Sequence, residues 1–215
     1  MFDFTPMTTS EMVFTNTQTE KVICDILQQK ISFPSNGKNI LLLYGVFGSG
    51  KTTYANIFFN EYESMFGGDN AYVNNIVVDN NEKITTTIER MDKSAQFIPF
   101  NQSNKHYFFI DEVDGYKIPQ QRRLKSWLSR GDIVCVMTTN YLCDIDKGLL
   151  SRSYVLEFNA CSNPNNYVKR MKQIIRQNKM TMIDNHTLMD IATSTNGDWR
   201  EMCALLQQAC NNASH

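Results

Sequence analysis

Short runs of consecutive apolar residues alternate along most of this chain with segments in which apolar residues recur every three or four positions. A continuous apolar run is typical of a strand buried on both faces, whereas the wider spacing predicts one face of a helix. The pattern predicts strands at residues 39–44, 72–79, 107–110, 133–137 and 154–158. It predicts helices before and between them at residues 17–30, 52–66, 83–94 and 119–130. This alternation favours an α/β domain of three layers with a mainly parallel sheet.

The pattern changes after residue 158, where a polar stretch that contains a proline follows at residues 159–166. Beyond it, periodic apolar positions predict three short helices, at residues 166–177, 185–193 and 198–209. Asp198 and Glu201 have the spacing of a capping box at the start of the last helix. We therefore expect two domains, an α/β core over residues 1–158 and a small all-helical domain over residues 159–215.

The composition is that of a globular protein, because 42% of the 215 residues are hydrophobic and 20% are charged. Lys and Arg number 21 against 22 Asp and Glu, and the net charge of −1 excludes recruitment of nucleic acid or membrane by bulk charge. The longest apolar run, residues 40–44, is too short to cross a bilayer. Residues 1–6 lack the features of a secretory signal. The six cysteines have no metal or redox spacing. We expect an intracellular protein without membrane contact.

The glycine-rich segment after the first strand carries the strongest chemical signal. Its sequence, GVFGSGKT from Gly45 to Thr52, matches the phosphate-loop pattern GxxxxGK[ST] at every fixed position. The glycines let backbone N–H groups point at a phosphate, and the following helix adds the positive end of its dipole. Lys51 would reach the β- and γ-phosphate oxygens, and the Thr52 hydroxyl would ligate Mg²⁺. The competing interpretation is a glycine-rich turn whose lysine faces solvent. The expected nucleotide contacts of this segment are Gly45, Val46, Phe47, Gly48, Ser49, Gly50, Lys51, Thr52 and Thr53.

A second motif follows about 60 residues later, where the apolar strand at residues 107–110 ends in Asp111 and Glu112. At a strand end the first carboxylate can approach a Mg²⁺ ion, while the second, on the turning chain, faces water beside the γ-phosphate. Asp111 is therefore the expected metal partner, and Glu112 the expected general base that orients the attacking water. Taken alone, the motif also fits a strand capped by two solvated acids. Together with the phosphate loop it predicts a hydrolase of nucleoside triphosphates.

These residues resemble those of the AAA+ ATPases, and within them the small ATPase subunits of sliding-clamp loaders of the replication factor C and phage type. Residues 110–114, IDEVD, are similar to the Walker B motif of that family, and the resemblance implies ATP and Mg²⁺ as cofactors. Residues 136–140 are similar to the sensor 1 strand, so Asn140 would help to hold the hydrolytic water. Residues 149–153, LLSRS, are similar to the Ser-Arg-Cys motif, and by that match Arg152 would complete the ATP site of a neighbouring subunit.

Residues 197–200, GDWR, resemble the sensor 2 signature at the start of the last helix of the family's lid domain. By this resemblance Arg200 would contact the γ-phosphate in its own subunit, which an arginine one turn into a helix can do as the domain closes. The competing interpretations are a surface ion pair for Arg152, a solvated position for Arg200 and a strand-end cap for Asn140. An arginine that acts in trans requires neighbours, so the resemblance implies a ring or spiral of identical or homologous subunits.

Two local clusters of basic residues stand out against the near-zero net charge. They are Lys117, Arg122, Arg123, Lys125 and Arg130, and Lys169, Arg170, Lys172, Arg176 and Lys179. In clamp loaders the helix after Walker B follows the duplex backbone, which makes Arg122, Arg123 and Lys125 the expected contacts to DNA phosphates. The competing interpretation for both clusters is a solvated helix face that pairs with acids elsewhere. Binding through either cluster would be independent of base sequence and sensitive to salt.

The resemblance implies an ATP-driven switch at the site of DNA replication, cytoplasmic or nuclear. In its ATP state it would bind primer-template DNA and a clamp or other replication partner, and it would release them on hydrolysis. The alternative is an AAA+ helicase loader or protein remodeller of a virus or mobile element. A nucleotide-binding scaffold that hydrolyses poorly fits less well, because the Walker, sensor and arginine positions are all filled. Clamp loaders ordinarily carry a collar domain after the lid, and the sequence up to residue 215 predicts a module without one.

Overall fold

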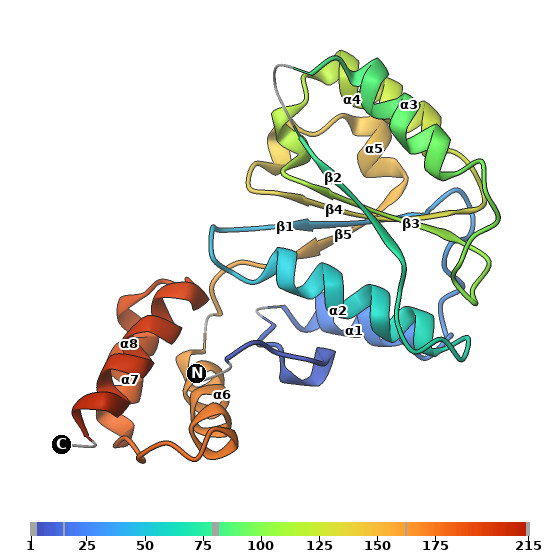
Figure 1. The fold of residues 1–215 in the computed structure, drawn as a ribbon. Coiled ribbons are helices and arrows are strands. Elements are labelled where there is room, and N and C mark those ends of the chain that lie inside the picture. Colours follow the sequence, from blue (N-terminus) through green and yellow to red (C-terminus); the bar gives the residue numbers. More distant parts are fainter. Residues whose placement is uncertain (1–3, 15, 79–81, 162, 214–215) are drawn as a thin grey trace.

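A computed structural model describes residues 4–14, 16–78, 82–161 and 163–213. It contains a five-stranded parallel sheet in the order β2-β3-β4-β1-β5 (Figure 1). The strands are β1 (Ile40–Tyr44), β2 (Val73–Val77), β3 (His106–Asp111), β4 (Ile133–Thr139) and β5 (Ser153–Glu157). All five lie at the predicted apolar runs, which confirms the α/β class. The predicted end of the second strand at Asp79, the first three residues and residues 214–215 lie outside the described part of the chain.

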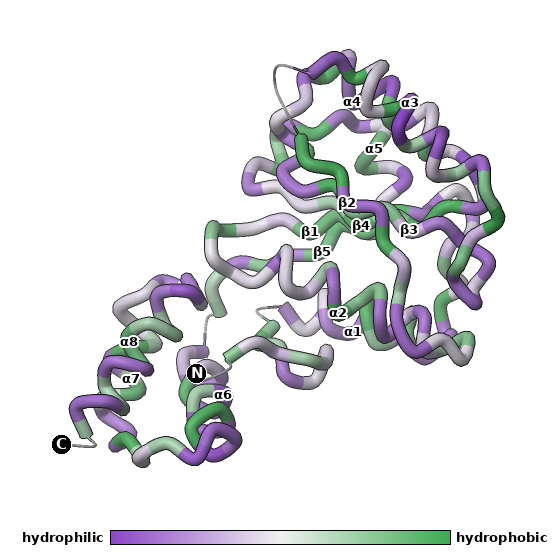
Figure 2. The backbone as a smooth tube through the Cα atoms, in the orientation of Figure 1, coloured by the Kyte–Doolittle hydropathy of each residue, from purple (hydrophilic) through white to green (hydrophobic). Residues whose placement is uncertain are grey.

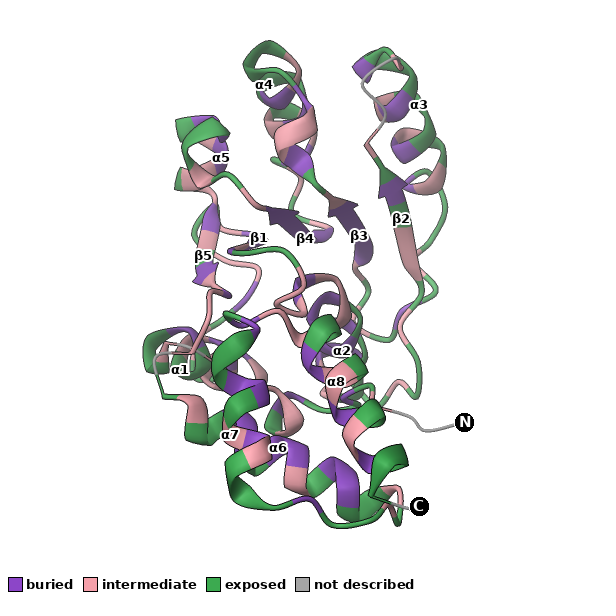
Figure 3. Ribbon diagram, turned by 90° about the vertical axis from the view of Figure 1, so that its left-hand side faces the viewer, coloured by how far each residue is buried: buried purple, intermediate pink, exposed green. Residues whose placement is uncertain are grey.

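Helices cover both faces of the sheet, because consecutive strand residues point to opposite sides. On β1, Leu41 and Leu43 pack into the apolar cluster on one face, and Ile40 and Leu42 into the cluster on the other. The first face is covered by α1 (Thr17–Leu27) and α2 (Lys51–Ser64), and the second by α3 (Ile84–Ser94), α4 (Ile118–Trp127) and α5 (Lys147–Ser151) (Figure 1). The strands β3 and β4, purple in Figure 3, are buried almost throughout. The predicted three layers are confirmed.

Two helices end earlier than the apolar pattern predicts. Helix α1 ends at Leu27 rather than near Lys30, because Gln29 adopts the left-handed backbone, with a φ of 59°. Helix α4 ends at Trp127 rather than at Arg130. The pattern does not predict α5, because a helix of five residues is too short to display a helical repeat. The structure also adds the short 3₁₀ helices η1 (Thr9–Glu11), η2 (Val113–Gly115) and η3 (Leu142–Asp144).

The C-terminal helices pack around an apolar cluster of their own and are referred to below as the helical domain. These helices are α6 (Pro164–Gln177), α7 (Asn185–Ser194) and α8 (Trp199–Asn212). Met171, Leu188 and Met202 are fully buried in their cluster. Green hydrophobic stretches recur along these helices between purple ones in Figure 2, as expected for helices with one buried face. Among the described residues, none of the helices combines the length and apolar character needed to span a membrane.

The N-terminal segment (residues 4–14) contacts both the α/β core and the helical domain. It is anchored on α2, where the Thr9 N–H donates to Glu61 Oε1 at 2.8 Å and the Thr9 hydroxyl donates to the other carboxylate oxygen. Phe4 and Val13 pack against the apolar cluster of the helical domain. The segment therefore runs along α2, from Glu61 near the end of the helix to Gly50 and Tyr54 at its start, where Met12 and Phe14 lie, and it sits at the junction between the two parts of the chain.

Candidate nucleotide site

The loop between β1 and α2 owes its shape to glycines. Gly48 has a φ of 71° and Gly50, which caps α2, has a φ of 88°, both in the left-handed region that favours glycine. A Cβ on Gly48 would lie 2.0 Å from Oδ1 of Asp198, at the start of α8. A larger residue at this position therefore requires the Asp198 side chain, which caps α8, to move.

The side chain of Lys51 is folded into this loop. It is only 8% exposed, and its Nζ donates to the carbonyl oxygens of Gly45 at 3.0 Å and Val46 at 2.7 Å. Burial lowers the pKa of Lys51 below the ordinary lysine value, and the nearby Asp111 carboxylate opposes that shift. The positive charge of Lys51 therefore lies inside the loop, next to the carbonyl oxygens of Gly45 and Val46. This charge would attract an anion that enters the loop.

The start of α8 is joined directly to the phosphate loop. The Trp199 N–H donates to the Gly48 carbonyl oxygen at 3.0 Å. The Asp198 carboxylate caps α8 and accepts hydrogen bonds from the N–H groups of Arg200 and Glu201. These contacts hold Arg200 next to the loop, close enough for its charge to lower the pKa of Lys51 further.

Oxygen atoms suited to Mg²⁺ meet where β3 ends beside α2. Thr52 Oγ1 lies 3.2 Å from Asp111 Oδ2 and 3.3 Å from Oδ1. The Thr138 hydroxyl, from β4, donates to Asp111 Oδ1 and orients the carboxylate. One carboxylate and one hydroxyl next to a phosphate loop fit the hard oxygen ligands that Mg²⁺ prefers, with the remaining positions open to water and phosphate oxygens.

The chain turns sharply at Glu112. This residue has φ 56° and ψ 52°, a left-handed conformation that is uncommon outside glycine and asparagine. Its N–H donates to Thr138 Oγ1 at 2.9 Å, which holds the turn in place. Asp111 is half-buried against Thr52 and Thr138, whereas the Glu112 side chain is exposed and lines the cleft beside the phosphate loop.

A single cleft at the carboxyl edge of the sheet collects most of the residues that sequence analysis selects. The cleft is lined by Phe47, Gly48, Ser49, Gly50, Lys51, Thr52, Thr53, Asp111, Glu112, Thr138, Asn140, Trp199 and Arg200. Asn140 directly follows β4, which lies between β1 and β3 in the sheet. Gly45 and Val46 belong to the same loop and bind Lys51 through their carbonyl oxygens. Thr138 and Trp199 are the two lining residues that sequence analysis does not select as site residues.

Arg152 lies at the opposite edge of the sheet. It immediately precedes β5, whose first residue pairs with Ile40, the first residue of β1. The phosphate loop follows the last residue of β1, and five strand residues at about 3.3 Å each separate the two edges by about 16 Å. The Arg152 guanidinium bonds to Ser129 Oγ at 3.2 Å and to the Gly148 carbonyl oxygen at 3.4 Å. Arg152 therefore does not reach the cleft of its own chain.

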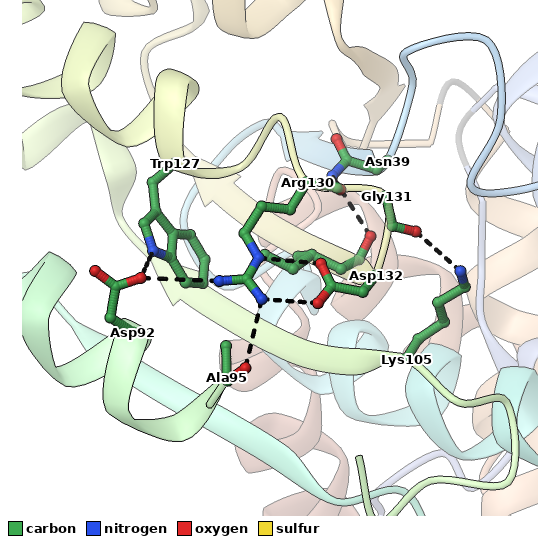
Figure 4. Close-up of polar contacts among 9 residues, drawn as sticks. Asn39, Asp92, Ala95, Lys105, Trp127, Arg130, Gly131 and Asp132 are labelled. Carbon is green, nitrogen blue, oxygen red and sulfur yellow. Dashed lines mark hydrogen bonds and ion pairs between the residues drawn. The ribbon is translucent and has the colours of Figure 1, made fainter. Parts of the chain in front are cut away.

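The basic residues on and after α4 differ in their contacts. Figure 4 shows Arg130 in an ion pair with Asp132, 2.8 Å between Nη2 and Oδ2, and in contact with Asp92 and the ring of Trp127. Arg130 therefore braces the ends of α3 and α4. Arg122 pairs with Asp146 at 3.1 Å. In the described part of the chain, the exposed Arg123 makes no hydrogen bond or ion pair.

A mostly apolar pocket adjoins the cleft, and sequence analysis does not identify it. It shares Ser49, Gly50, Thr53 and Trp199 with the cleft. Its other lining residues are Pro6, Glu11, Met12, Val13, Phe158, Asn159, Tyr167, Arg170 and Gly197. The rings of Tyr167 and Trp199 stack, with 6.0 Å between their centroids. These residues come from distant parts of the chain, so no local motif signals the pocket.

The family model described as AAA, the ATPase family associated with various cellular activities, matches residues 41–160. An uncharacterized protein of Thermotoga maritima is 29% identical over 170 residues, which cover 77% of this chain and 26% of that protein. Two structures of RuvB variants from Thermotoga maritima align with TM-scores of 0.69 and 0.70, at 18% and 17% identity. They align over 95% of this chain and 64% of theirs, so the chain spans only part of each relative, and the likeness to RuvB shows the fold alone.

Proposed function

This chain belongs to the AAA family of ATPases, whose model matches more than half of it, and from that premise we propose that it hydrolyses ATP to ADP and phosphate in a Mg²⁺-dependent reaction. The observation that carries this proposal is the cleft in which the phosphate loop, Asp111, Glu112 and Asn140 meet. The Thr52 hydroxyl and the Asp111 carboxylate would hold Mg²⁺, which when bound neutralises charge on the phosphate oxygens.

The chain's own residues divide the work of hydrolysis. The backbone N–H groups of the phosphate loop and Lys51 bind the phosphates, and the positive charge stabilises the leaving β-phosphate oxygen. Glu112, exposed beside the loop, takes a proton from water as the water oxygen bonds to the γ-phosphorus and the bond to the β-phosphate oxygen breaks. Asn140 holds that water in line, and Arg200 contacts the γ-phosphate from the start of α8. The adjoining apolar pocket takes the base of the nucleotide.

Arg152 serves the cleft of a neighbouring subunit in this proposal. Its place at the opposite edge of the sheet supports a role in trans, because its own cleft is about 16 Å away. Identical or homologous subunits that pack edge to edge, so that Arg152 of one faces the cleft of the next, form a ring or spiral.

We place this ATPase in DNA replication, as a switch that resembles a clamp-loader subunit. The bond between Trp199 and Gly48 supports the switch, because it transmits a change in the phosphate loop to the helical domain. The direct test compares the ATPase rate with and without primer-template DNA at low and high salt. Stimulation that weakens with salt supports the DNA-dependent switch. No stimulation at low salt favours the alternative, a helicase loader or protein remodeller.

DNA contact is proposed through α4, whose exposed Arg123 has no partner in the described part of the chain. Arg122 and Lys125 flank it, but Arg122 also pairs with Asp146. Changing Arg123 and Lys125 together to Ala lowers the affinity for duplex DNA and reduces the slope of log K against log salt by about 2, because two phosphate contacts are lost. Fluorescence anisotropy at several salt concentrations measures the slope. The control is Lys21→Ala on α1, and an unchanged slope in the double variant rejects this surface.

A replication partner is proposed to dock on the apolar loop (residues 96–101) between α3 and β3. Phe97, Ile98 and Phe100 are 70%, 85% and 79% exposed, and Tyr72 stacks against Phe100. With about 150–250 Å² for each aromatic side chain, this patch has roughly 500–600 Å² of exposed apolar surface. That area is at the upper end of the ~300–600 Å² of the largest apolar patch on a typical monomer, and below the ~800 Å² per partner of a stable dimer. It fits an anchor that enters an apolar pocket of another protein.

The charges around the apolar loop indicate which charge the binding surface of the partner carries. Lys93 lines the same surface, whereas its neighbour Asp92 is paired with Trp127 and Arg130. A pocket with an acidic rim is therefore complementary. Our proposed partner is the sliding clamp of the same replication system.

Changing Phe97 and Phe100 together to Ser lowers the affinity for that sliding clamp by about 100-fold, because two anchor side chains leave the pocket. Basal ATPase activity is retained, since neither side chain lines the cleft. Calorimetric titration of the clamp measures the affinity, and Met182→Ser, another exposed apolar residue, is the matched control. Equal affinity of the double variant and the control contradicts the assignment of this loop.

A further inference from the structure

Phe47 and Tyr141 form an exposed aromatic pair at the mouth of the cleft. Phe47, in the phosphate loop, is 58% exposed, and Tyr141, which follows Asn140 after β4, is 52% exposed. Their rings meet edge to face, with 6.4 Å between the centroids. The aromatic pair therefore holds apolar surface in water at the carboxyl edge of the sheet, and a surface that covers it gains free energy.

A hollow of about 490 Å³ lies at the opposite edge of the sheet. It is built by residues 34–39, 129–131 and 151–152, three segments that lead into β1, β4 and β5. These strands are parallel neighbours, so their amino ends meet at one edge. We call this feature the amino-edge hollow, and Arg152 is among its lining residues.

The charge of the amino-edge hollow is complementary to that of a cleft filled with nucleotide. The hollow is lined by three cations, Lys38, Arg130 and Arg152, and none of the described residues that line it is acidic. Arg130 is paired with Asp132, but the side chains of Lys38 and Arg152 make hydrogen bonds only to neutral oxygens in the described part of the chain. The phosphates of a bound nucleotide would make the cleft negative. Cations in the hollow also attract the face of an aromatic ring.

A head-to-tail arrangement of copies brings these two surfaces together. Arg152 lies at the amino edge and the cleft at the carboxyl edge, so a second Arg152 reaches the cleft when the amino edge of one copy faces the carboxyl edge of the next. Phe47 lines the cleft, and Arg152 lines the amino-edge hollow. The same arrangement therefore places the aromatic pair opposite the hollow.

We propose that the aromatic pair of one copy enters the amino-edge hollow of the next copy and aligns Arg152 with the neighbouring cleft, an inference that rests on the proposed role of Arg152 in trans. About half of each ring is exposed, which at about 150–250 Å² per aromatic side chain leaves roughly 150–250 Å² for the pair. This area is far below the ~800 Å² per partner of a stable interface. The aromatic pair thus positions the neighbour, and association also requires nucleotide in the cleft.

Two variants each remove one side of this contact. Tyr141→Ser takes away an exposed ring, and Gly131→Trp fills the hollow. A Cβ at Gly131 would have no other atom within 4 Å, and the Gly131 carbonyl oxygen, which accepts from Lys105 Nζ at 2.9 Å, is kept (Figure 4). Light scattering in Mg²⁺ and ATP measures self-association. Each variant weakens it about tenfold and retains ATP affinity, since neither position lines the cleft. The matched control is Tyr72→Ser, an exposed tyrosine at neither surface.

Mixing the two variants tests whether the aromatic pair and the hollow meet each other. The Gly131→Trp chain keeps its aromatic pair and the Tyr141→Ser chain keeps its hollow, so one junction between them is intact and the outer end of each chain is blocked. At concentrations at which each variant alone is monomeric, the mixture forms dimers that do not grow further. Should Gly131→Trp fail to fold, Ser151→Trp, at an exposed position of the same hollow, replaces it.

The outcomes separate this inference from the proposed function. If the unaltered chain hydrolyses ATP and stays monomeric with ATP, the role of Arg152 in trans is wrong, and the contact between the aromatic pair and the hollow falls with it. If the unaltered chain associates and both variants associate as tightly, or their mixture forms no dimers, that contact alone is wrong.

Discussion

Glu112→Gln lowers the turnover of ATP by about 10²–10⁴-fold and leaves ATP binding intact. Glutamine has nearly the size of glutamate but cannot take a proton from the attacking water. The phosphate loop and the Asp111–Thr52 contact do not involve the Glu112 carboxylate, so the affinity for nucleotide is retained. A phosphate-release assay measures turnover, and calorimetry with ATP measures binding.

The matched control for this change is Glu89→Gln, which removes one negative charge from an exposed position on α3. It is expected to retain full activity. Undiminished turnover in purified Glu112→Gln protein would sink the assignment of the general base. A parallel loss of binding and turnover would instead indicate that the turn at Glu112, held by Thr138, supports the phosphate loop.

Arg152→Ala lowers turnover by about 10³-fold, because the cleft of each subunit loses the cation that the neighbour supplies. Each chain keeps its own affinity for ATP, since Arg152 lies at the opposite edge of the sheet from its own phosphate loop. The control is Lys147→Ala, at the exposed start of the same short helix. Turnover and ATP affinity are measured with the same two assays.

Mixing the two inactive variants tests whether Arg152 acts in trans. An Arg152→Ala chain retains Glu112, and a Glu112→Gln neighbour retains Arg152, so together they build a complete site. In a random equal mixture about a quarter of the sites are of this kind, and activity returns in proportion. Absence of rescue at every mixing ratio, with assembly confirmed by light scattering, counts against a role in trans.

Local patterns predict the sheet and the phosphate loop well, because their signals lie in neighbouring residues. The strands are buried on both faces and therefore appear as continuous apolar runs, such as residues 40–44 before the loop. The loop needs glycine at positions with a left-handed backbone, and Gly48 and Gly50 occupy two of them. Helix ends are less predictable. The residue with a left-handed backbone just after α1 is Gln29, and glutamine, unlike glycine, is not a sequence signal for a helix end.

Long-range contacts explain what the sequence pattern leaves out. Arg170 falls in a basic run that reads as a surface cluster, yet it is buried because the N-terminal segment brings Glu11 to it. Thr138 reads as an ordinary strand residue, and only the pairing of β4 with β3 brings its hydroxyl to Asp111 and Glu112. The position of Arg152 also depends on strand pairing. The parallel register of β1 and β5 places it at the edge of the sheet opposite the cleft.

The hydrogen bond from the Trp199 N–H to the Gly48 carbonyl oxygen attaches the start of α8 directly to the phosphate loop. The bond joins two backbone groups, so it does not depend on which side chain position 199 carries. The 14 residues of α8 extend about 21 Å from that attachment. In the switch that we propose, a rotation of about 10° at the loop would move the far end of the helix by about 4 Å, so α8 would amplify a small adjustment around a phosphate.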